Sequence, residues 1–202
     1  MNFDTSTTMA THIGNRLALL PLPLVLLPGG IQRIKIFESK HLALIKEAAK
    51  GNGFVLSLFK PDLPHKSSLW GVQVKVIDFE FDDHFLVVDI QAEDLVCLTE
   101  ISQSAEGVLF ANVAPKTHWE SRQITPDMKI LVKQLRAIFH KHPNLKRLYR
   151  KTYFNDPNWV CARFIEVLPL SLNEKEKCIL EYRLDQIEAF LNTIISGPTI
   201  KS

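Results

Sequence analysis

Few residues of this chain could perform chemistry, and the first to consider is a pair of histidines. His140-Lys141-His142 places two imidazoles two positions apart, a spacing that suits a shared metal ion when the segment is a strand. Here the pair ends a helical pattern just before Pro143, so the two side chains point to different sides of the helix. Histidines at a helix C-terminus interact favourably with the helix dipole. We therefore predict no metal site.

Nucleophilic and phosphate chemistry is not predicted either. The sequence contains no G-x-x-x-x-G-K-[ST] loop for nucleotide phosphates and no G-x-S-x-G elbow for a nucleophilic serine. Ser39-Lys40 is interpreted as a helix start, because a nucleophilic serine needs a desolvated base within hydrogen-bonding reach. The Asp-Asp-His sequence at 82–84 is typical of a hairpin turn. We predict no catalytic residue and no cofactor.

Charge is strongly segregated along the chain, although the net charge is only +2. Between Lys75 and Lys116 there is no Lys or Arg, and the acids there are Asp78, Glu80, Asp82, Asp83, Asp89, Glu93, Asp94, Glu100 and Glu106. The preferred interpretation is that this run and the basic run at 129–151 are solvated faces, or attract each other. The alternative is a basic site for an acidic partner, with members Lys133, Arg136, Lys141, Lys146, Arg147, Arg150 and Lys151.

Composition is that of an ordinary globular protein, with 46% apolar and 23% charged residues. The apolar run at 17–27 has the length of a signal-peptide core, but Pro21 and Pro23 break the required helix. It is also shorter than the ~20 residues that span a bilayer. The cysteines are odd in number and far apart, which favours a reducing compartment, and we interpret all three as small apolar residues: Cys97, Cys161 and Cys178. We expect a cytoplasmic protein without a membrane segment.

Apolar periodicity divides the chain into three parts. Residues 1–16 form a polar tail that is predicted to be disordered. Residues 17–118 are mostly strands and are predicted to form a barrel subdomain. Residues 119–202 have helical periodicity and are predicted to form a helical bundle subdomain.

Alternating apolar and polar residues predict strands at 72–81, 85–90 and 95–101, among others. One helix is expected among the strands, starting at a capping Ser39 and ending near Gly51. About six strands around one helix favour a small closed barrel, because closure removes exposed strand edges.

Capping signals place the helices of the C-terminal part. Thr125 precedes a proline and an acid, and the helix that it opens is expected to stop at Pro143. The sequence Asn-Asp-Pro at 155–157 starts a second helix. Asn173 and Glu176 have capping-box spacing, and a single long helix is predicted from there to Gly197.

In their order and spacing, several short motifs resemble the N-terminal substrate-recognition domain of Lon proteases, in the form of a free-standing bacterial Lon-domain protein. The matching stretches are LPLPLVLLPG at 20–29, IFESKHLAL at 36–44, WG at 70–71, DPNW at 156–159 and LPLSLNEK at 168–175. They cover most of residues 17–196. The chain departs from the family at 92–95, where Ala-Glu-Asp-Leu replaces a frequent glycine and arginine.

The resemblance implies an α+β fold, with a PUA-like β pseudo-barrel of about six strands and one embedded helix, followed by a C-terminal helical bundle. It also implies a non-catalytic protein that binds unfolded or exposed polypeptide or a protease partner, since the ATPase and proteolytic modules of Lon proteases are missing from the sequence. The oligomeric state is not predicted.

The junction of barrel and bundle is the expected ligand site, because such junctions are frequent binding sites. Candidate peptide-binding residues are the aromatics Phe37, Trp70, Trp119 and Tyr153. Trp70 and Trp119 are candidates for partly exposed anchors, but burial in the core or junction is the preferred interpretation for both. For Phe37, burial in the core is the preferred interpretation.

RNA binding is the second hypothesis, because the barrel is PUA-like and segment 129–151 is basic. Its candidate phosphate contacts are Lys133, Arg136, Arg147 and Arg150. The acidic sequence of the barrel argues against this alternative, since it lacks a pattern of basic and aromatic residues for stacking on bases.

Overall fold

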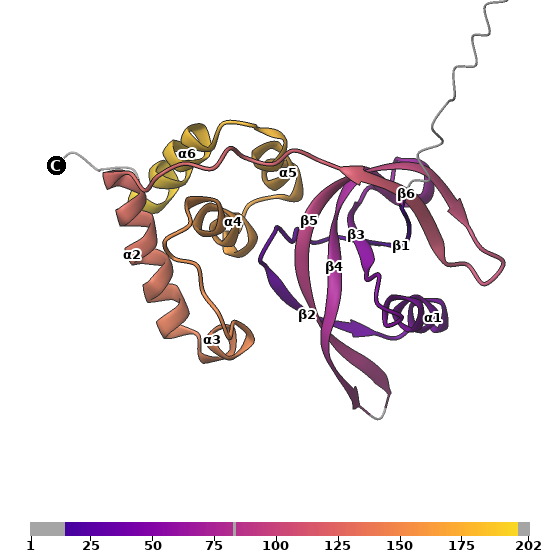
Figure 1. The fold of residues 1–202 in the computed structure, drawn as a ribbon. Coiled ribbons are helices and arrows are strands. Elements are labelled where there is room, and N and C mark those ends of the chain that lie inside the picture. The colour runs from indigo at the N-terminus through magenta and orange to yellow at the C-terminus, as the bar shows by residue number, and fades with distance from the viewer. Residues whose placement is uncertain (1–14, 83, 198–202) are drawn as a thin grey trace, which may run out of the picture.

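The computed structural model describes residues 15–82 and 84–197, and six strands within them form one sheet in the order β2-β5-β4-β3-β1-β6. The strands are β1 (Asn15–Leu22), β2 (Ile31–Ile36), β3 (Phe54–Phe59), β4 (Ser67–Asp82), β5 (Phe85–Gln103) and β6 (Leu109–Pro115). Because β5 also pairs with β6, the sheet closes on itself as a pseudo-barrel (Figure 1).

Strand β5 closes the barrel because it is long enough to have two partners along one side. Residues 86–91 pair with β2, residues 96–103 pair with β6, and β4 runs along the other side. Two separate strands were predicted over 85–101, but the chain stays extended between them. Ala92 exchanges hydrogen bonds with the Gly29-Gly30 turn, from Gly29 N to Ala92 O (3.0 Å) and from Ala92 N to Gly30 O (2.8 Å).

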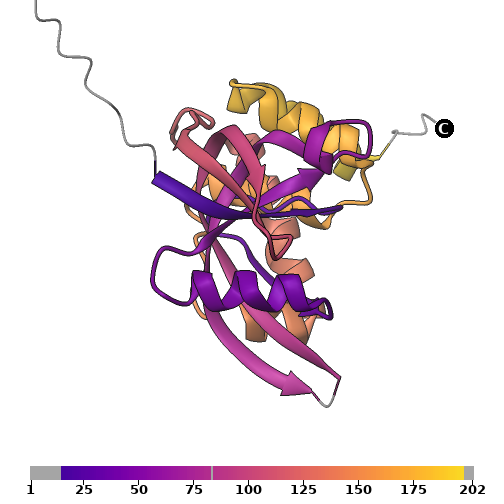
Figure 2. The ribbon, with the colours of Figure 1, turned by 90° about the vertical axis from the view of Figure 1, so that its right-hand side faces the viewer.

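Helix α1 (Ser39–Ala48) packs against the barrel through Leu44, Ile45 and Ala48, which are buried. Figure 2 shows it lying across the sheet. The prediction that Ser39 caps this helix is wrong: the N-cap residue is Glu38, and its side chain makes no capping hydrogen bond. The only other helical turn in the described part of the barrel is a short 3₁₀ turn, η1 (Pro64–Lys66).

The helical part contains α2 (Pro126–Lys141), α3 (Pro143–Leu148), α4 (Pro157–Val167), α5 (Leu172–Leu180) and α6 (Leu184–Ser196). The predicted cap Thr125 is confirmed, since its hydroxyl accepts from Met128 N. The helix start predicted at 155–157 is confirmed too, and its cap is Asp156, whose carboxylate accepts from Asn158 N. Helix α2 packs on α4 and α6.

One expectation for these helices is confirmed and one is wrong. Helix α2 ends at Lys141, just before Pro143 as predicted, and Pro143 then begins α3, a position where a proline loses no hydrogen bond. The single long helix expected from Asn173 is two helices, and the capping box belongs to Ser171 and Glu174. Glu176, which was expected to complete that box, points instead to the barrel.

The predicted fold class, an α+β pseudo-barrel of six strands with an embedded helix and a C-terminal helical part, is confirmed. The division into subdomains 17–118 and 119–202 stays a prediction. The predicted tail lies outside the described residues, except for Asn15 and Arg16, which belong to β1. No helix among the described residues is long and apolar enough to cross a membrane.

Candidate functional site

The turn between β1 and β2 docks closely on α4, and two glycines allow this. A Cβ atom at Gly29 would lie 2.8 Å from Trp159 Cδ1, and one at Gly30 would lie 2.6 Å from Glu166 Oε1. Gly29 also has φ +75°, a left-handed conformation that favours glycine. The glycine pair therefore lets the barrel backbone approach the helix.

A buried ion pair holds this turn. Arg163 Nη2 lies 2.7 Å from Glu166 Oε1, one turn away on α4. The same guanidinium nitrogen donates to Leu27 O (2.9 Å), and Leu27 N donates to Glu166 Oε1 (2.7 Å). Arg163 is only 1% exposed, so its charge depends on these partners. Burial raises the pKa of Glu166 above its ordinary value, and the attraction to Arg163 offsets only part of that shift.

An aromatic cluster extends the contact. Ile31 N donates to Tyr149 Oη (2.9 Å), so the first residue of β2 is tied to the segment after α3. The Tyr149 ring meets Trp159 and Phe139 edge to face, with centroid distances of 6.0 and 5.3 Å. Burial raises the pKa of Tyr149 to about 12, so the phenol stays neutral at physiological pH.

Helix α5 makes a second joint with the barrel. The Glu176 carboxylate accepts from Trp70 Nε1 (2.9 Å) and from Lys60 Nζ. The 116–125 connection adds a third contact, because Trp119 Nε1 donates to Cys178 O (3.2 Å). The two parts are thus fastened together at several points.

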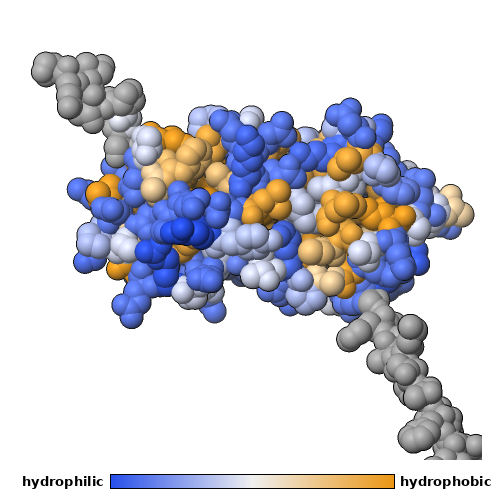
Figure 3. Space-filling view, turned by 90° about the horizontal axis from the view of Figure 1, so that it is seen from above, coloured by the Kyte–Doolittle hydropathy of each residue, from blue (hydrophilic) through white to orange (hydrophobic). Residues whose placement is uncertain are grey.

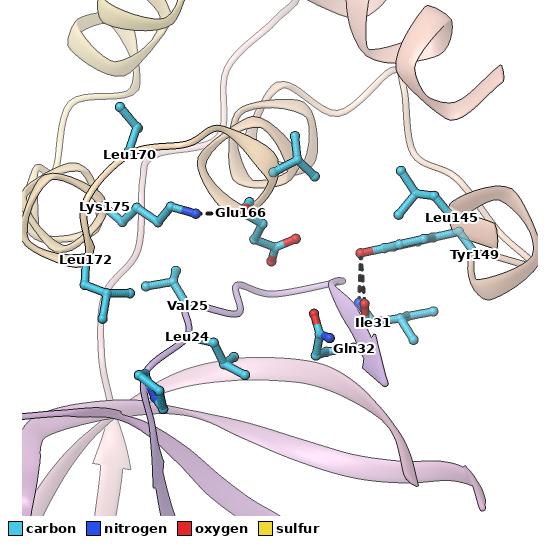
Figure 4. A pocket seen from close by; sticks show the side chains of 12 residues that line it. Leu24, Val25, Ile31, Gln32, Leu145, Tyr149, Glu166, Leu170, Leu172 and Lys175 are labelled. Carbon is cyan, nitrogen blue, oxygen red and sulfur yellow. Dashed lines mark hydrogen bonds between the residues drawn. The ribbon is translucent and has the colours of Figure 1, made fainter. Parts of the chain in front are cut away.

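A cavity of about 230 Å³ opens between these contacts (Figure 4). It is lined by Pro23, Leu24, Val25, Ile31, Gln32, Leu145, Tyr149, Glu166, Val167, Leu170, Leu172 and Lys175. The lining comes from the β1–β2 connection and the start of β2 on one side and from the helical part on the other. This volume is below the roughly 300–1,000 Å³ of pockets for drug-sized ligands, so the cavity suits one or two side chains.

Polar groups share the cavity surface with the apolar side chains, and four lining residues have polar side chains: Gln32, Tyr149, Glu166 and Lys175. Lys175 Nζ donates to Glu166 O (2.7 Å), and burial lowers the pKa of Lys175. From the barrel side, the Gln32 amide is the polar side chain that lines the cavity. Among the described lining residues there is no serine, cysteine or histidine. The arrangement therefore supports apolar contacts and hydrogen bonds with a bound segment.

The four aromatics predicted as peptide-binding residues do not come together, and none of them lines the cavity. Trp70 (9% exposed) and Trp119 (4%) are buried, as preferred from the sequence, so neither is an exposed anchor, and each indole nitrogen has a partner on α5. Phe37, the first residue after β2, is 65% exposed and its ring centroid lies 5.2 Å from that of Phe85, which corrects its expected burial. Tyr153 is 50% exposed. A peptide-binding role for any of them stays a prediction.

The predicted basic residues Lys133, Arg136, Arg147 and Arg150 are exposed on α2, on α3 and just after α3. Two of them are engaged within the helical part. The Arg136 guanidinium lies 4.2 Å from the Phe154 ring centroid, and Arg147 Nη2 donates to Asn144 Oδ1 (2.6 Å). The RNA alternative is therefore not favoured.

Sequence reasoning missed the residues that build the junction. Tyr149 stands among basic residues, with nothing to mark it as buried. Arg163 does carry a signal, because it interrupts the apolar sequence of α4 with a charge on the buried side of the helix.

Among residues 15–82 and 84–197, no three His, Cys, Asp or Glu side chains are grouped so that they could hold a metal ion. The surface seen from above is mostly hydrophilic, with separate hydrophobic groups over the barrel and the helices (Figure 3). This face offers no single continuous apolar surface.

The similarity of this chain to known proteins lies in its structure. No protein-family model and no curated protein matches the sequence. The crystal structure of a Lon N-terminal domain protein from Xanthomonas campestris superposes with a TM-score of 0.68 at 22% identity, covering 87% of this chain and 96% of that chain. The N-terminal domain of the Mycobacterium avium complex Lon protease superposes with a TM-score of 0.61 at 14% identity, covering 87% and 95%. This chain therefore has the fold of Lon N-terminal domains.

Proposed function

We propose that this chain binds unfolded or otherwise exposed polypeptide at the junction cavity, without chemistry of its own. The observation that carries the proposal is the cavity of about 230 Å³, which is lined by apolar side chains and by polar groups from both parts of the molecule. An apolar side chain of the ligand loses water there, while the Gln32 amide and the Lys175 ammonium group are placed to meet its backbone.

The size of the cavity sets how binding must work. Full burial of one leucine or phenylalanine side chain contributes about 1.5–3 kcal/mol. A micromolar dissociation constant needs about 8 kcal/mol. The cavity therefore acts as an anchor within a longer contact, and extended segments bind more tightly than single residues.

The likeness in fold supports this role. One of the two similar structures is the N-terminal domain of a Lon protease. A module in that place suits the capture of polypeptide for degradation, so a protease partner is part of the proposal. A cytoplasmic location also belongs to it and is supported by three free thiols, Cys97, Cys161 and Cys178.

The test is fluorescence anisotropy with a reduced, carboxymethylated and labelled polypeptide, titrated with the chain at several salt concentrations. Leu170→Asp places a charge in the cavity and is expected to weaken binding at least tenfold. Leu180→Asp is the matched control, because Leu180 lies on α5 outside the cavity and is 46% exposed. We expect binding to persist in salt, since apolar contacts do not release counterions.

The opposite results would overturn the proposal. If Leu170→Asp bound the polypeptide as tightly as the unaltered chain does, the cavity would not be part of the binding site. Salt-sensitive binding of a labelled single-stranded RNA, with none of the polypeptide, would instead assign function to the basic segment 129–151.

A further inference from the structure

Strand β4 has an open edge at its far end. Strand β3 pairs with β4 only as far as Phe54 opposite Val74, and residues 75–82 pair with β5 alone among the described residues. The chain turns away at Gly53 (φ +64°), where a Cβ atom would lie 2.1 Å from Val74 O. The end of the β4–β5 hairpin therefore projects from the barrel (Figure 1, Figure 2).

One face of this open edge carries exposed apolar side chains. Two rows cross the sheet here, Ile34–Val88–Phe79 and Ile36–Leu86–Phe81. The first two members of each row are buried, but Phe79 is 63% and Phe81 74% exposed. Their rings touch edge to face at 6.2 Å, as expected for residues on one side of a strand. Each row would be completed by an apolar residue on a further strand.

The other face of the edge is acidic. Asp78 lies opposite Asp89, which is already neutralised by two hydrogen bonds from Arg33 (2.7 and 2.8 Å). Asp78 and Glu80 are exposed and border a hollow of about 30 Å³ with Arg33 and Asp89. The outer carboxylates are thus placed to attract cationic side chains of a further strand.

Backbone groups at the edge are also available. Phe79 N donates to its neighbour Asp78 Oδ1 (2.9 Å), so this N–H points away from β5. A carbonyl of an added strand could replace that carboxylate oxygen and free Asp78 for a cationic partner. Addition of a strand at such an edge is a common mode of peptide recognition.

We propose that residues 75–82 bind an extended segment of another polypeptide, in which apolar residues alternate with Lys or Arg, as an added strand. The apolar residues continue the rows beyond Phe79 and Phe81. The cationic residues lie beside Asp78 and Glu80. This surface is separate from the junction cavity, and the inference does not depend on the function proposed for that cavity.

Charge argues against a second copy of this chain as the occupant. In an antiparallel pair, residues directly opposite each other point to the same face. Two-fold pairing of this edge with itself would therefore set Asp78 and Glu80 opposite acidic residues of the other copy. Like charges directly opposite are destabilising, whereas a Lys or Arg at the same place is favourable.

The test uses the full chain and a labelled ten-residue peptide of alternating valine and lysine, followed by fluorescence anisotropy. We expect saturable binding, at least tenfold weaker for the matched valine–glutamate peptide. Methylation of the four central backbone nitrogens should abolish it, because the paired N–H donors are lost. The double variant Asp78→Lys with Glu80→Lys should prefer the glutamate peptide.

Matched variants locate the binding. Phe79→Ser with Phe81→Ser should weaken it at least tenfold, and both positions are exposed, so the fold is kept. Leu69→Ser is the control: Leu69 is 69% exposed at the other end of β4, where β3 pairs with the strand. Leu170→Asp in the cavity should leave this binding unchanged, which separates this proposal from the function proposed above.

Three results would overturn the inference. The first is that the lysine peptide binds the unaltered chain and the double serine variant equally tightly, or that it binds neither protein. The second is binding that survives backbone methylation, which would mean charge attraction alone. The third is a dimer of the free chain in sedimentation that the double serine variant loses, which would make a second copy the occupant.

Discussion

Arg163 Nη2 and Glu166 Oε1 lie 2.7 Å apart, and both atoms also bind the backbone of one barrel residue, Leu27. The pair thus satisfies the N–H and the C=O of the same residue while neutralising its own charges. This makes the barrel and helix α4 one packed unit around the junction cavity.

Removal of the negative charge should be strongly destabilising. Glu166→Gln leaves the Arg163 guanidinium buried without a counter-charge, and we expect a loss of about 3 kcal/mol in the free energy of unfolding by urea. Glu47→Gln is the control, because its ion pair with Lys50 is exposed and should contribute less than about 1 kcal/mol. Equal losses for the two variants would contradict the structural role of the buried pair.

The close approach at the glycine turn can be measured with two alanines. Gly29 and Gly107 have similar positive φ, of +75° and +83°, so alanine at either position carries a comparable conformational cost. The added Cβ would lie 2.8 Å from Trp159 Cδ1 at Gly29, but 3.8 Å from Gln103 Nε2, an ordinary contact, at Gly107. We expect Gly29→Ala to unfold more easily than Gly107→Ala by about 1–3 kcal/mol. Equal urea midpoints for the two alanine variants would contradict a close approach of the turn to α4.

Stability should fall in acid because of His118. Burial, with the nearby charges of Lys116 and Arg163, lowers the pKa of His118 from 6.5 to about 4. The folded state therefore resists protonation that the unfolded chain accepts, and this stability is complete above pH 6.5 and lost progressively toward pH 4. The loss amounts to about 3 kcal/mol at most.

The comparison that isolates this effect is with His118→Gln, which cannot titrate. The difference in unfolding free energy between the two proteins should change across pH 6.5 to 4, and other groups, such as Glu166, contribute equally to both. A difference that stays constant over this range would contradict a partly buried imidazole that stays neutral in the folded state.

The cysteines should differ in reactivity. Cys97 is exposed, whereas burial raises the pKa of both Cys161 and Cys178. We expect one thiol to react rapidly with a disulfide reagent in the native protein and three after unfolding. Cys97→Ser should abolish the rapid phase. Rapid reaction of two thiols in the native chain would show that the helical core opens readily.

Local signals were readable from the sequence, and contacts between distant segments were not. The cap Thr125 and the helix start at 155–157 were predicted because such a signal depends only on nearby residues in the sequence. Glu176 has the right spacing for a capping box after Asn173, but it binds Trp70 and Lys60 instead, a choice set by packing across the molecule. Arg163 meets Leu27 from 136 positions away, so its partner could not be inferred.

The site shows the same limit. The expectation of a ligand site at the junction rested on architecture, and a cavity lies there. The aromatics chosen for it do not line it, because burial depends on neighbours that only the fold brings together. Trp119, for example, is covered by the helix that carries Cys178.

The most direct test of polypeptide binding at the junction is amide hydrogen exchange of the full chain, with and without a saturating unfolded polypeptide, read by mass spectrometry. We predict slower exchange in residues 23–32 and 166–175, which line the cavity from its two sides. Slower exchange confined to residues 129–151, or unchanged exchange on both sides of the cavity, would contradict the account.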